Sequence, residues 1–434
     1  MARILPLPLM ATLLFCGCAR LSTQAGGPLA PEARLKAEAD GIREDLEAFR
    51  ERKFRELPRI VQLPASAKCS VWDSAAQIGW VARKGLEPSS SVDAIFQATG
   101  LIRPGGNASH QRERMDCVVV KAMFQSRSRR IVVFDDSTVD RRQSLAHEMV
   151  HALQSEKLNL DTMLRSRSEP DAFLGKLGAL EGEADFVADR VVGAASSPGC
   201  VDPSASILWT LDRSIHAVPQ LAETPPIVGL PVYSPNVLGQ RLACLLYARW
   251  GAAGLDTLLN RPPRGSFQLI HPTEYLKDVH EVDWDTAWSG IGQLPAGWLP
   301  AGQMRIGEVR LAALPLTWDR NLAADALRGE GLGWRGDRIW MARDREGRAA
   351  YVWRMSFSNP EKATEFGRLW WRILSIRRDR NLPAFEKRRR RSMWFEPGRG
   401  THLVCAKGSD VLVSEGFDSL FAIKIQKSAF PRPR

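Results

Sequence analysis

HEMVH, residues 147–151, is the stretch of this 434-residue chain that says most about its fold. On a helix, side chains four positions apart project from nearly the same face, so His147 and His151 can bind one metal ion. Glu148 then lies beside the metal, where it can act on a water molecule. Because the chain has only 7 histidines, a chance match to this spacing has a probability on the order of one per cent. The pattern predicts a zinc-binding helix.

The residues before the motif predict the elements that would position it. Residues 131–134 are β-branched and aromatic, as is typical of a strand, and residues 142–154 carry apolar side chains at helical spacing. Residues 117–120 predict a second strand, joined to the first by a polar turn at 125–128. We therefore expect a small sheet before the metal-binding helix. Its edge strand would hold an extended peptide alongside the metal.

A catalytic zinc needs a third protein ligand, because such sites hold the metal with three side chains and keep a further position for water. A second helix is predicted over residues 171–192, and it carries the acids of LEGEAD, residues 180–185. Glu181 and Asp185 lie four apart and share a face, whereas Glu183 points elsewhere. We expect Glu181 to be the third ligand and Asp185 to orient a ligand imidazole. The alternative is that these are ordinary surface acids of an amphipathic helix.

Together the two motifs resemble the gluzincin metallopeptidases, in which HExxH is followed on a later helix by Glu-x-x-x-Asp. Here 181 − 151 puts the glutamate 30 residues after the second histidine. More narrowly, residues 145–154 with 180–184 are similar to a group of uncharacterised bacterial secreted proteins that carry HELxHALQDQ and ALxEGxA. Ser155 and Glu156 stand where that group usually has Asp-Gln, which leaves the ligands untouched. The resemblance implies a zinc metallopeptidase fold and says little about the substrate.

Two further segments carry the same resemblance, which covers roughly residues 50–420. RPPRGSFQLIHPTEYL, residues 261–276, resembles a PP…LHPxxYL motif, and GWRGDR, residues 333–338, resembles GWxGDR. A peptidase needs a donor for the oxyanion that develops on the substrate carbonyl. His271 and Tyr275 in the first segment are the main candidates, and Tyr233 is another. The alternative is structural: His271 could cap a turn and Tyr275 could pack.

The N-terminus predicts export. Arg3 precedes an apolar run over residues 4–15, which is typical of a secretory signal and too short for a stable membrane span. Gly17 directly before Cys18 indicates lipoprotein processing, with a signal peptide over 1–17 and acylation of the Cys18 thiol. Ordinary signal cleavage is the alternative, because a phenylalanine lies three positions before that cysteine. We expect a cell-envelope protein that is lipid-anchored to a bacterial membrane, with the outer membrane preferred, or secreted.

The expected fold class is α+β: a mainly helical zincin-like catalytic domain with a small sheet, followed by a smaller C-terminal α+β module. In that module hairpins are predicted at 339–355 and 402–413, with a helix at 359–374 between them. Further helices are predicted at 91–101 and 237–260. The predicted order is a signal peptide at 1–17, a lipidated cysteine and flexible tether at 18–33, a charged amphipathic helix at 34–56, the metallopeptidase-like domain at 57–300 and the basic module at 301–434.

The chain is basic, with a formal net charge of +11, and residues 386–391 read EKRRRR. Such a run can neutralise phosphates of nucleic acid or anionic lipid, and Trp370, Trp371 and Trp394 could stack on bases. For an exported protein we favour a solvated loop that touches an anionic membrane surface, and we expect no specific nucleic-acid partner. None of the cysteines lies in a CxxC pair, so a cysteine metal site is not expected.

Two classes of function follow from these patterns. The first is a membrane-anchored or secreted zinc-dependent peptidase that uses Glu148 as general base, with zinc as cofactor and a protein or peptide as substrate. The second is a zinc-binding but non-proteolytic surface lipoprotein that acts as a binding or adhesion component. A carboxylate beside the metal favours the first class, because a protein released from catalysis has no need of it.

Overall fold

The computed structural model of the chain describes residues 31–71, 90–103, 105–106, 108, 111–112, 115, 119–135, 140–164, 169–193, 206–284, 293–327, 331–383, 385 and 391–430. The predicted signal peptide and Cys18 lie outside these residues, as do residues 386–390 of the basic run. Among the described residues, no helix combines the length and apolar content that a membrane crossing requires.

The first half of the chain is mainly helical and includes a small sheet. Its elements are α1 (Pro31–Arg50), β1 (Arg59–Pro64), η1 (Ala65–Ala67), α4 (Ser90–Thr99), β2 (Ala122–Gln125), β3 (Arg130–Asp135), α6 (Arg141–Ser155), α7 (Leu160–Leu164), α8 (Pro170–Val192), α9 (Ser206–Ala217), η2 (Pro219–Leu221), α10 (Pro226–Trp250), α11 (Ala252–Asn260), α12 (Ser266–Ile270) and α13 (Pro272–Leu276). The sheet has the order β1-β3-β2, with β1 parallel and β2 antiparallel to β3.

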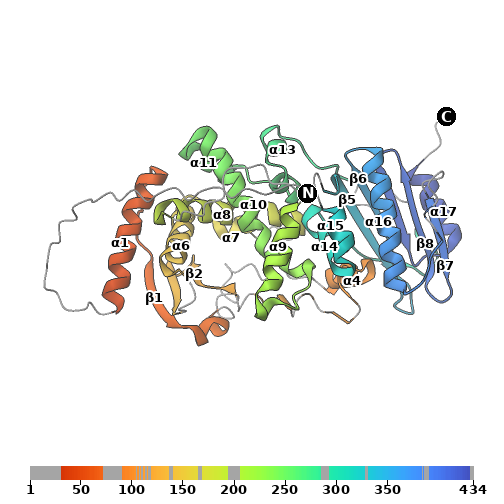
Figure 1. Ribbon diagram of the computed structural model, residues 1–434, viewed down its shortest axis with the longest axis horizontal. Helices are drawn as coiled ribbons and strands as arrows, with labels where there is room; N and C mark the ends of the chain where they lie inside the picture. The colour runs from red at the N-terminus through yellow and green to blue at the C-terminus, as the bar shows by residue number, and fades with distance from the viewer. Residues whose placement is uncertain are drawn as a thin grey trace, which may run out of the picture.

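The second half is built on a six-stranded antiparallel sheet of order β4-β5-β6-β9-β8-β7. Its elements are β4 (Leu299–Met304), α14 (Glu308–Trp318), α15 (Arg320–Ala326), β5 (Trp334–Arg343), β6 (Ala349–Phe357), α16 (Pro360–Arg378), β7 (Arg391–Glu396), β8 (Gly400–Lys407), β9 (Asp410–Glu415) and α17 (Ser419–Ala429). Figure 1 shows an elongated molecule with α1 and the small sheet at one end and the large sheet at the other. The predicted α+β class is confirmed.

The charged helix predicted at 34–56 is α1, and it packs on its own chain. Leu35, Ile42 and Leu46 are 3%, 0% and 0% exposed, and α1 contacts both α6 and α8. The charged side chains on its other face pair with neighbours, as in the Arg141–Glu38 ion pair to α6. Because one face is apolar and the other charged, burial of the first is enough to hold the helix on the domain.

The helix α8 is central to the first half, and a close crossing with α10 fixes its position. A Cβ at Gly182 would lie 2.0 Å from the backbone carbonyl carbon of Gly239, and one at Gly239 would lie 2.0 Å from the carbonyl oxygen of Gly178. No side chain fits between the two backbones at this point. Glycine is therefore required where α8 and α10 cross, and the crossing brings side chains of α10 against the acidic face of α8.

Two element predictions need correction. Of the strand predicted at 117–120, residues 117 and 118 lie outside the described residues, and Val119 is helical. The strand that pairs with β3 is β2, over Ala122–Gln125, so the predicted position is wrong. The helix predicted at 237–260 is two helices, because Gly251 adopts a positive φ of 59° that ends α10 and begins α11. Pairing register decides the first case, and the conformation of one glycine decides the second.

The segments 261–276 and 333–338 meet in a buried polar junction between the two halves. Asp171, at the start of α8, is 0% exposed and accepts hydrogen bonds from the backbone N–H and the hydroxyl of Ser266. Asp337 accepts from the backbone N–H groups of Ile306 and Gly307, each at 3.0 Å. These acids satisfy backbone donors that would otherwise be buried without partners. The junction thus joins the first turn of α8 to the large sheet.

The tryptophans considered for base stacking and the cysteines of the described residues have the following environments. Trp370 and Trp371 are buried against the large sheet, and Trp394 stacks on His402 with ring centroids 5.1 Å apart. The first two are therefore closed to stacking on nucleic-acid bases. Cys244 is disulfide-bonded, whereas Cys69 and Cys405 are free thiols.

Glu281 at this junction makes stability depend on pH. Burial raises its pKa to about 7, with added repulsion from Asp171. Between pH 4.5, the ordinary pKa of a glutamate, and about pH 7, Glu281 keeps its proton in the folded chain and loses it in the unfolded chain. The free energy of unfolding therefore falls as pH rises through that window. We expect Glu281→Gln to raise the free energy of unfolding by about 1 to 3 kcal/mol at pH 8 and to leave it nearly unchanged at pH 4. Urea unfolding of both proteins at the two pH values measures this, and an equal difference at both pH values would contradict it.

Candidate metal centre

The helices α6 and α8 bring together the three residues that the sequence predicts as metal ligands. The Nε2 atoms of His147 and His151 lie 3.0 Å apart, and the Glu181 Oε2 atom lies 3.2 Å and 3.4 Å from them. The ligand atoms of this group all fall within 4.8 Å of one another. Asp140 caps α6 by accepting from the Gln143 N–H, which helps to set where the helix begins.

This set of donors fits a zinc ion. Zinc takes imidazole nitrogen and carboxylate oxygen at about 2.0–2.2 Å in tetrahedral geometry, which places ligand atoms about 3.3 Å from one another. The three separations observed are 3.0, 3.2 and 3.4 Å. Two imidazoles and one carboxylate are also the ligand set of one class of catalytic zinc site, in which the fourth position is kept for water.

The imidazole of His147 is oriented by Asp185, as the sequence predicts. The Nδ1 atom of His147 lies 2.7 Å from Asp185 Oδ1, which leaves Nε2 directed at the other two residues. The second oxygen of Asp185 accepts from the Asn236 side-chain amide at 2.9 Å, and the same amide lies 3.5 Å from Glu181. Asn236 was not predicted. Its side chain lies at the centre because the glycine crossing brings α10 against α8, and no local sequence pattern predicts that contact.

The charges of the centre are coupled. Burial opposes ionisation of Glu181, but the two imidazoles outweigh this effect and hold its pKa well below the ordinary range. Burial likewise opposes a charge on His147, yet Asp185 and Glu181 raise its pKa well above the ordinary value. The centre therefore favours a negative carboxylate beside positive charge. A divalent cation would supply that positive charge in place of the imidazole protons.

Glu148 lies on the same helix and is held by the small sheet. It is 8% exposed, and its Oε2 atom accepts from the backbone N–H of Phe124 in β2 at 2.6 Å. Burial raises its pKa above the ordinary value, although His147 and His151 oppose this. A carboxyl group with a raised pKa that sits next to the ligand set is suited to accept and return a proton.

The strand β2 lies at the edge of the small sheet, beside Glu148. Its neighbour in register is β3, where Phe124 lies opposite Ile131, and the Phe134 N–H donates to the Lys121 carbonyl. In an antiparallel ladder the pairs alternate, so the backbone polar groups of Ala122 and Phe124 face away from β3. The structure thus has an edge strand beside Glu148, five residues later in the chain than predicted. Whether it holds a peptide stays a prediction.

The residues predicted to stabilise an oxyanion have contacts of their own. His271 Nε2 lies 3.0 Å from Glu308 Oε2, and the Tyr275 hydroxyl donates to the Arg261 carbonyl at 2.8 Å. The cluster of metal-ligating side chains does not include His271. Tyr233 lies on α10, one turn before Asn236, and burial raises its pKa. The contacts of His271 and Tyr275 give both residues structural roles, and their catalytic assignment stays a prediction.

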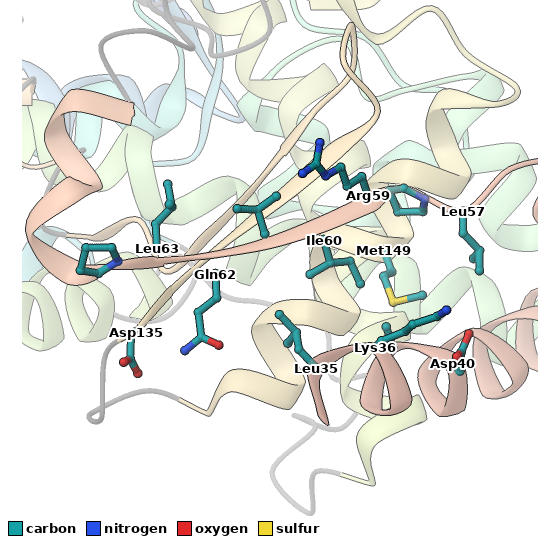
Figure 2. A pocket seen from close by; sticks show the side chains of 14 residues that line it. Leu35, Lys36, Asp40, Leu57, Arg59, Ile60, Gln62, Leu63, Asp135 and Met149 are labelled. Carbon is teal, nitrogen blue, oxygen red and sulfur yellow. The ribbon is translucent and has the colours of Figure 1, made fainter. Parts of the chain in front are cut away.

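A separate groove of about 1010 Å³ lies behind α6, between α1 and β1. Figure 2 shows Met149 between these two elements, with Leu35 of α1 and Ile60 of β1 nearby. Met149 lies two positions from His147 and therefore on the opposite face of the helix. The ligand residues do not line this groove, so it is not part of the metal centre.

Comparison with known proteins covers the second half only. Residues 246–423 match a family described as a domain of unknown function (DUF8575). No curated protein and no solved structure matches the chain. The matched residues include the segments 261–276 and 333–338 but none of His147, His151 and Glu181. The predicted domain boundary at residue 300 falls inside the match and stays a prediction.

If Glu181 is the third ligand, Glu181→Gln should weaken zinc binding by more than about 100-fold, because the neutral amide is a poor ligand beside two imidazoles. Asp189→Asn is the matched control. Asp189 lies two turns further along α8 and bonds to Gln143 and Gln240, away from the three ligands. Competition with a chelating dye measures both affinities. Equal affinities for the two variants would remove Glu181 from the ligand set.

Proposed function

We propose that the protein is a zinc-dependent peptidase that hydrolyses peptide bonds with Glu148 as general base. The observation that carries this proposal is the convergence of His147, His151 and Glu181 next to a buried carboxylate. A zinc site that served structure alone would usually be closed by a fourth protein ligand. Among the described residues, no fourth His, Cys, Asp or Glu joins the cluster.

Each residue of the site would have a separate role in the proposed hydrolysis. His147, His151 and Glu181 would hold zinc, with Asp185 orienting the first imidazole. Zinc bound there supplies a Lewis acid that polarises the substrate carbonyl and makes a water molecule acidic near neutral pH. Glu148 accepts a proton from the attacking water and later delivers it to the leaving amine. The Phe124 N–H fixes one oxygen of Glu148, so that the other is available for this transfer.

The edge of β2 supports a place for the substrate. An extended peptide that pairs with the outward-facing backbone groups of Ala122 would run past Glu148, because Phe124, two residues further along β2, donates its backbone N–H to that carboxylate. Main-chain pairing would give affinity without fixing side-chain specificity. A protein or peptide chain in extended form is therefore the substrate class we propose.

We also propose that the enzyme works in the cell envelope. The support is in the sequence: an apolar run over 4–15 and a cysteine at position 18 preceded by glycine. A lipid on Cys18 would anchor the chain to a bacterial membrane, and plain signal cleavage would release it. Mass spectrometry of the exported protein distinguishes the two.

The decisive test is Glu148→Gln. This change keeps the ligand set, so we expect zinc content equal to that of the wild type, about one ion per chain. Cleavage of an unstructured protein such as casein should fall by at least about 100-fold, because the proton acceptor is lost. Metal analysis and a peptide-release assay measure the two quantities.

The outcomes separate the candidate functions. Zinc in both proteins with cleavage only by the wild type supports a peptidase. Zinc in both proteins with cleavage by neither points to the non-proteolytic surface lipoprotein. Equal cleavage by both would overturn the role of Glu148, and no zinc in either would overturn the site.

A further inference from the structure

A chain of buried contacts runs from His151 to the last residue of α1. The Nδ1 atom of His151 lies 2.8 Å from Gln154 Oε1, and Gln154 Nε2 donates to Glu183 Oε2 at 3.0 Å. The other oxygen of Glu183 lies 2.7 Å from Arg50 Nε. The contacts cross from α6 to α8 and then to α1. Glu183 therefore points away from the three ligands, as its place in the sequence predicts, but it is connected to one of them.

The directions of these hydrogen bonds are fixed by chemistry. Gln154 Nε2 also donates to the Leu180 carbonyl at 3.0 Å, and a carbonyl can only accept. A carboxylate paired with a guanidinium can likewise only accept. The Gln154 amide nitrogen must therefore face Leu180 and Glu183, and its oxygen must face His151. His151 then carries its proton on Nδ1 and presents the Nε2 lone pair to the other ligands.

Arg50 supplies the positive charge that allows Glu183 to stay ionised in the core. The side chains of Arg50 and Glu183 are each 1% exposed, and a buried carboxylate is costly unless a counter-charge is close. The other two guanidinium nitrogens also have partners: Nη1 donates to the Ala252 carbonyl at 3.2 Å and Nη2 to Asp256 at 2.9 Å. A buried ion pair is weak as a source of stability, because well-packed apolar residues often do as well. A role in orienting His151 accounts for it better.

We infer that Gln154, Glu183 and Arg50 are positioning residues of the metal centre, which fix the tautomer and ring orientation of His151 and make α1 a part of that centre. The inference rests on the proposed function, since it takes His151 to be a metal ligand. His147 has the corresponding support from Asp185 and Asn236. The two imidazoles are thus held from opposite sides, one by α10 through α8 and the other by α1 through α8.

The test uses the full chain and four variants. Gln154→Leu removes the amide, Arg50→Met removes the charge, and Arg50→Lys restores the charge without the planar donor set. The matched control is Arg141→Gln, which breaks the Arg141–Glu38 ion pair between α1 and α6 but touches no member of the relay, that is, of the contacts from His151 through Gln154 and Glu183 to Arg50. Two quantities are measured: zinc affinity by dye competition, and the tautomer of His151 in the metal-free protein by nitrogen NMR of labelled histidine.

We expect the Nδ1–H tautomer of His151 in the wild type and in Arg141→Gln, at a pH where the ring is neutral. In Gln154→Leu the tautomers should mix and zinc affinity should fall by about 10- to 100-fold. Arg50→Met should act in the same direction, and Arg50→Lys should recover part of the loss. The tautomer is the critical readout, because mere loss of stability would not change which ring nitrogen carries the proton.

The outcomes are distinguishable from failure of the proposed function. If the wild type binds no zinc, the site itself is wrong. If the wild type binds zinc and folded Gln154→Leu keeps both its affinity and the Nδ1–H tautomer, only the relay is overturned. A fall in affinity in Arg141→Gln as large as in Arg50→Met would also overturn it, because the effect would then belong to the packing of α1. If Arg50→Met does not fold, the zinc affinity and the His151 tautomer of Arg50→Lys are compared with those of the wild type instead, and wild-type values for both would overturn the role of the planar Arg50 donor set.

Discussion

The close crossing of α8 and α10 at Gly182 and Gly239 is the constraint on which the centre depends. It admits no side chain, so the two helices are held at backbone contact. All the acidic groups of the centre outside α6 belong to α8, and each works with a different neighbour: Glu181 with the two histidines, Glu183 with α1 and Asp185 with α10. Because α8 makes these contacts with three helices at once, it tolerates little displacement: a shift that shortens one contact lengthens another.

The sequence was informative wherever spacing within one helix determines geometry. His147 with His151, and Glu181 with Asp185, share faces because they lie four positions apart, and α6 and α8 begin and end close to the predicted residues. Asn236 and Arg50 escaped prediction because they reach the centre through tertiary contacts that leave no periodic signal. The strand β2 was placed five residues early, since the β-branched run before it suggested a strand but pairing with β3 decided the register.

The motifs of the second half have a structural explanation that the resemblance alone did not supply. Ser266, at the start of α12, donates to Asp171, and Asp337 binds the backbone at Ile306 and Gly307. Asp171 and Glu181 belong to the same helix, so the junction fixes one end of α8 while the crossing with α10 fixes its middle. The segments 261–276 and 333–338 therefore act on the centre through the position of α8.

The place of α1 follows from the same logic. An amphipathic, highly charged helix could have been an arm that binds a partner, but its apolar residues Leu35, Ile42 and Leu46 are buried against α6 and α8. Its last residue, Arg50, neutralises Glu183 inside the core. Detaching α1 would expose that apolar face and leave a buried carboxylate without its counter-charge, and each of these is costly. The helix α1 is thus part of the domain that carries the candidate metal centre.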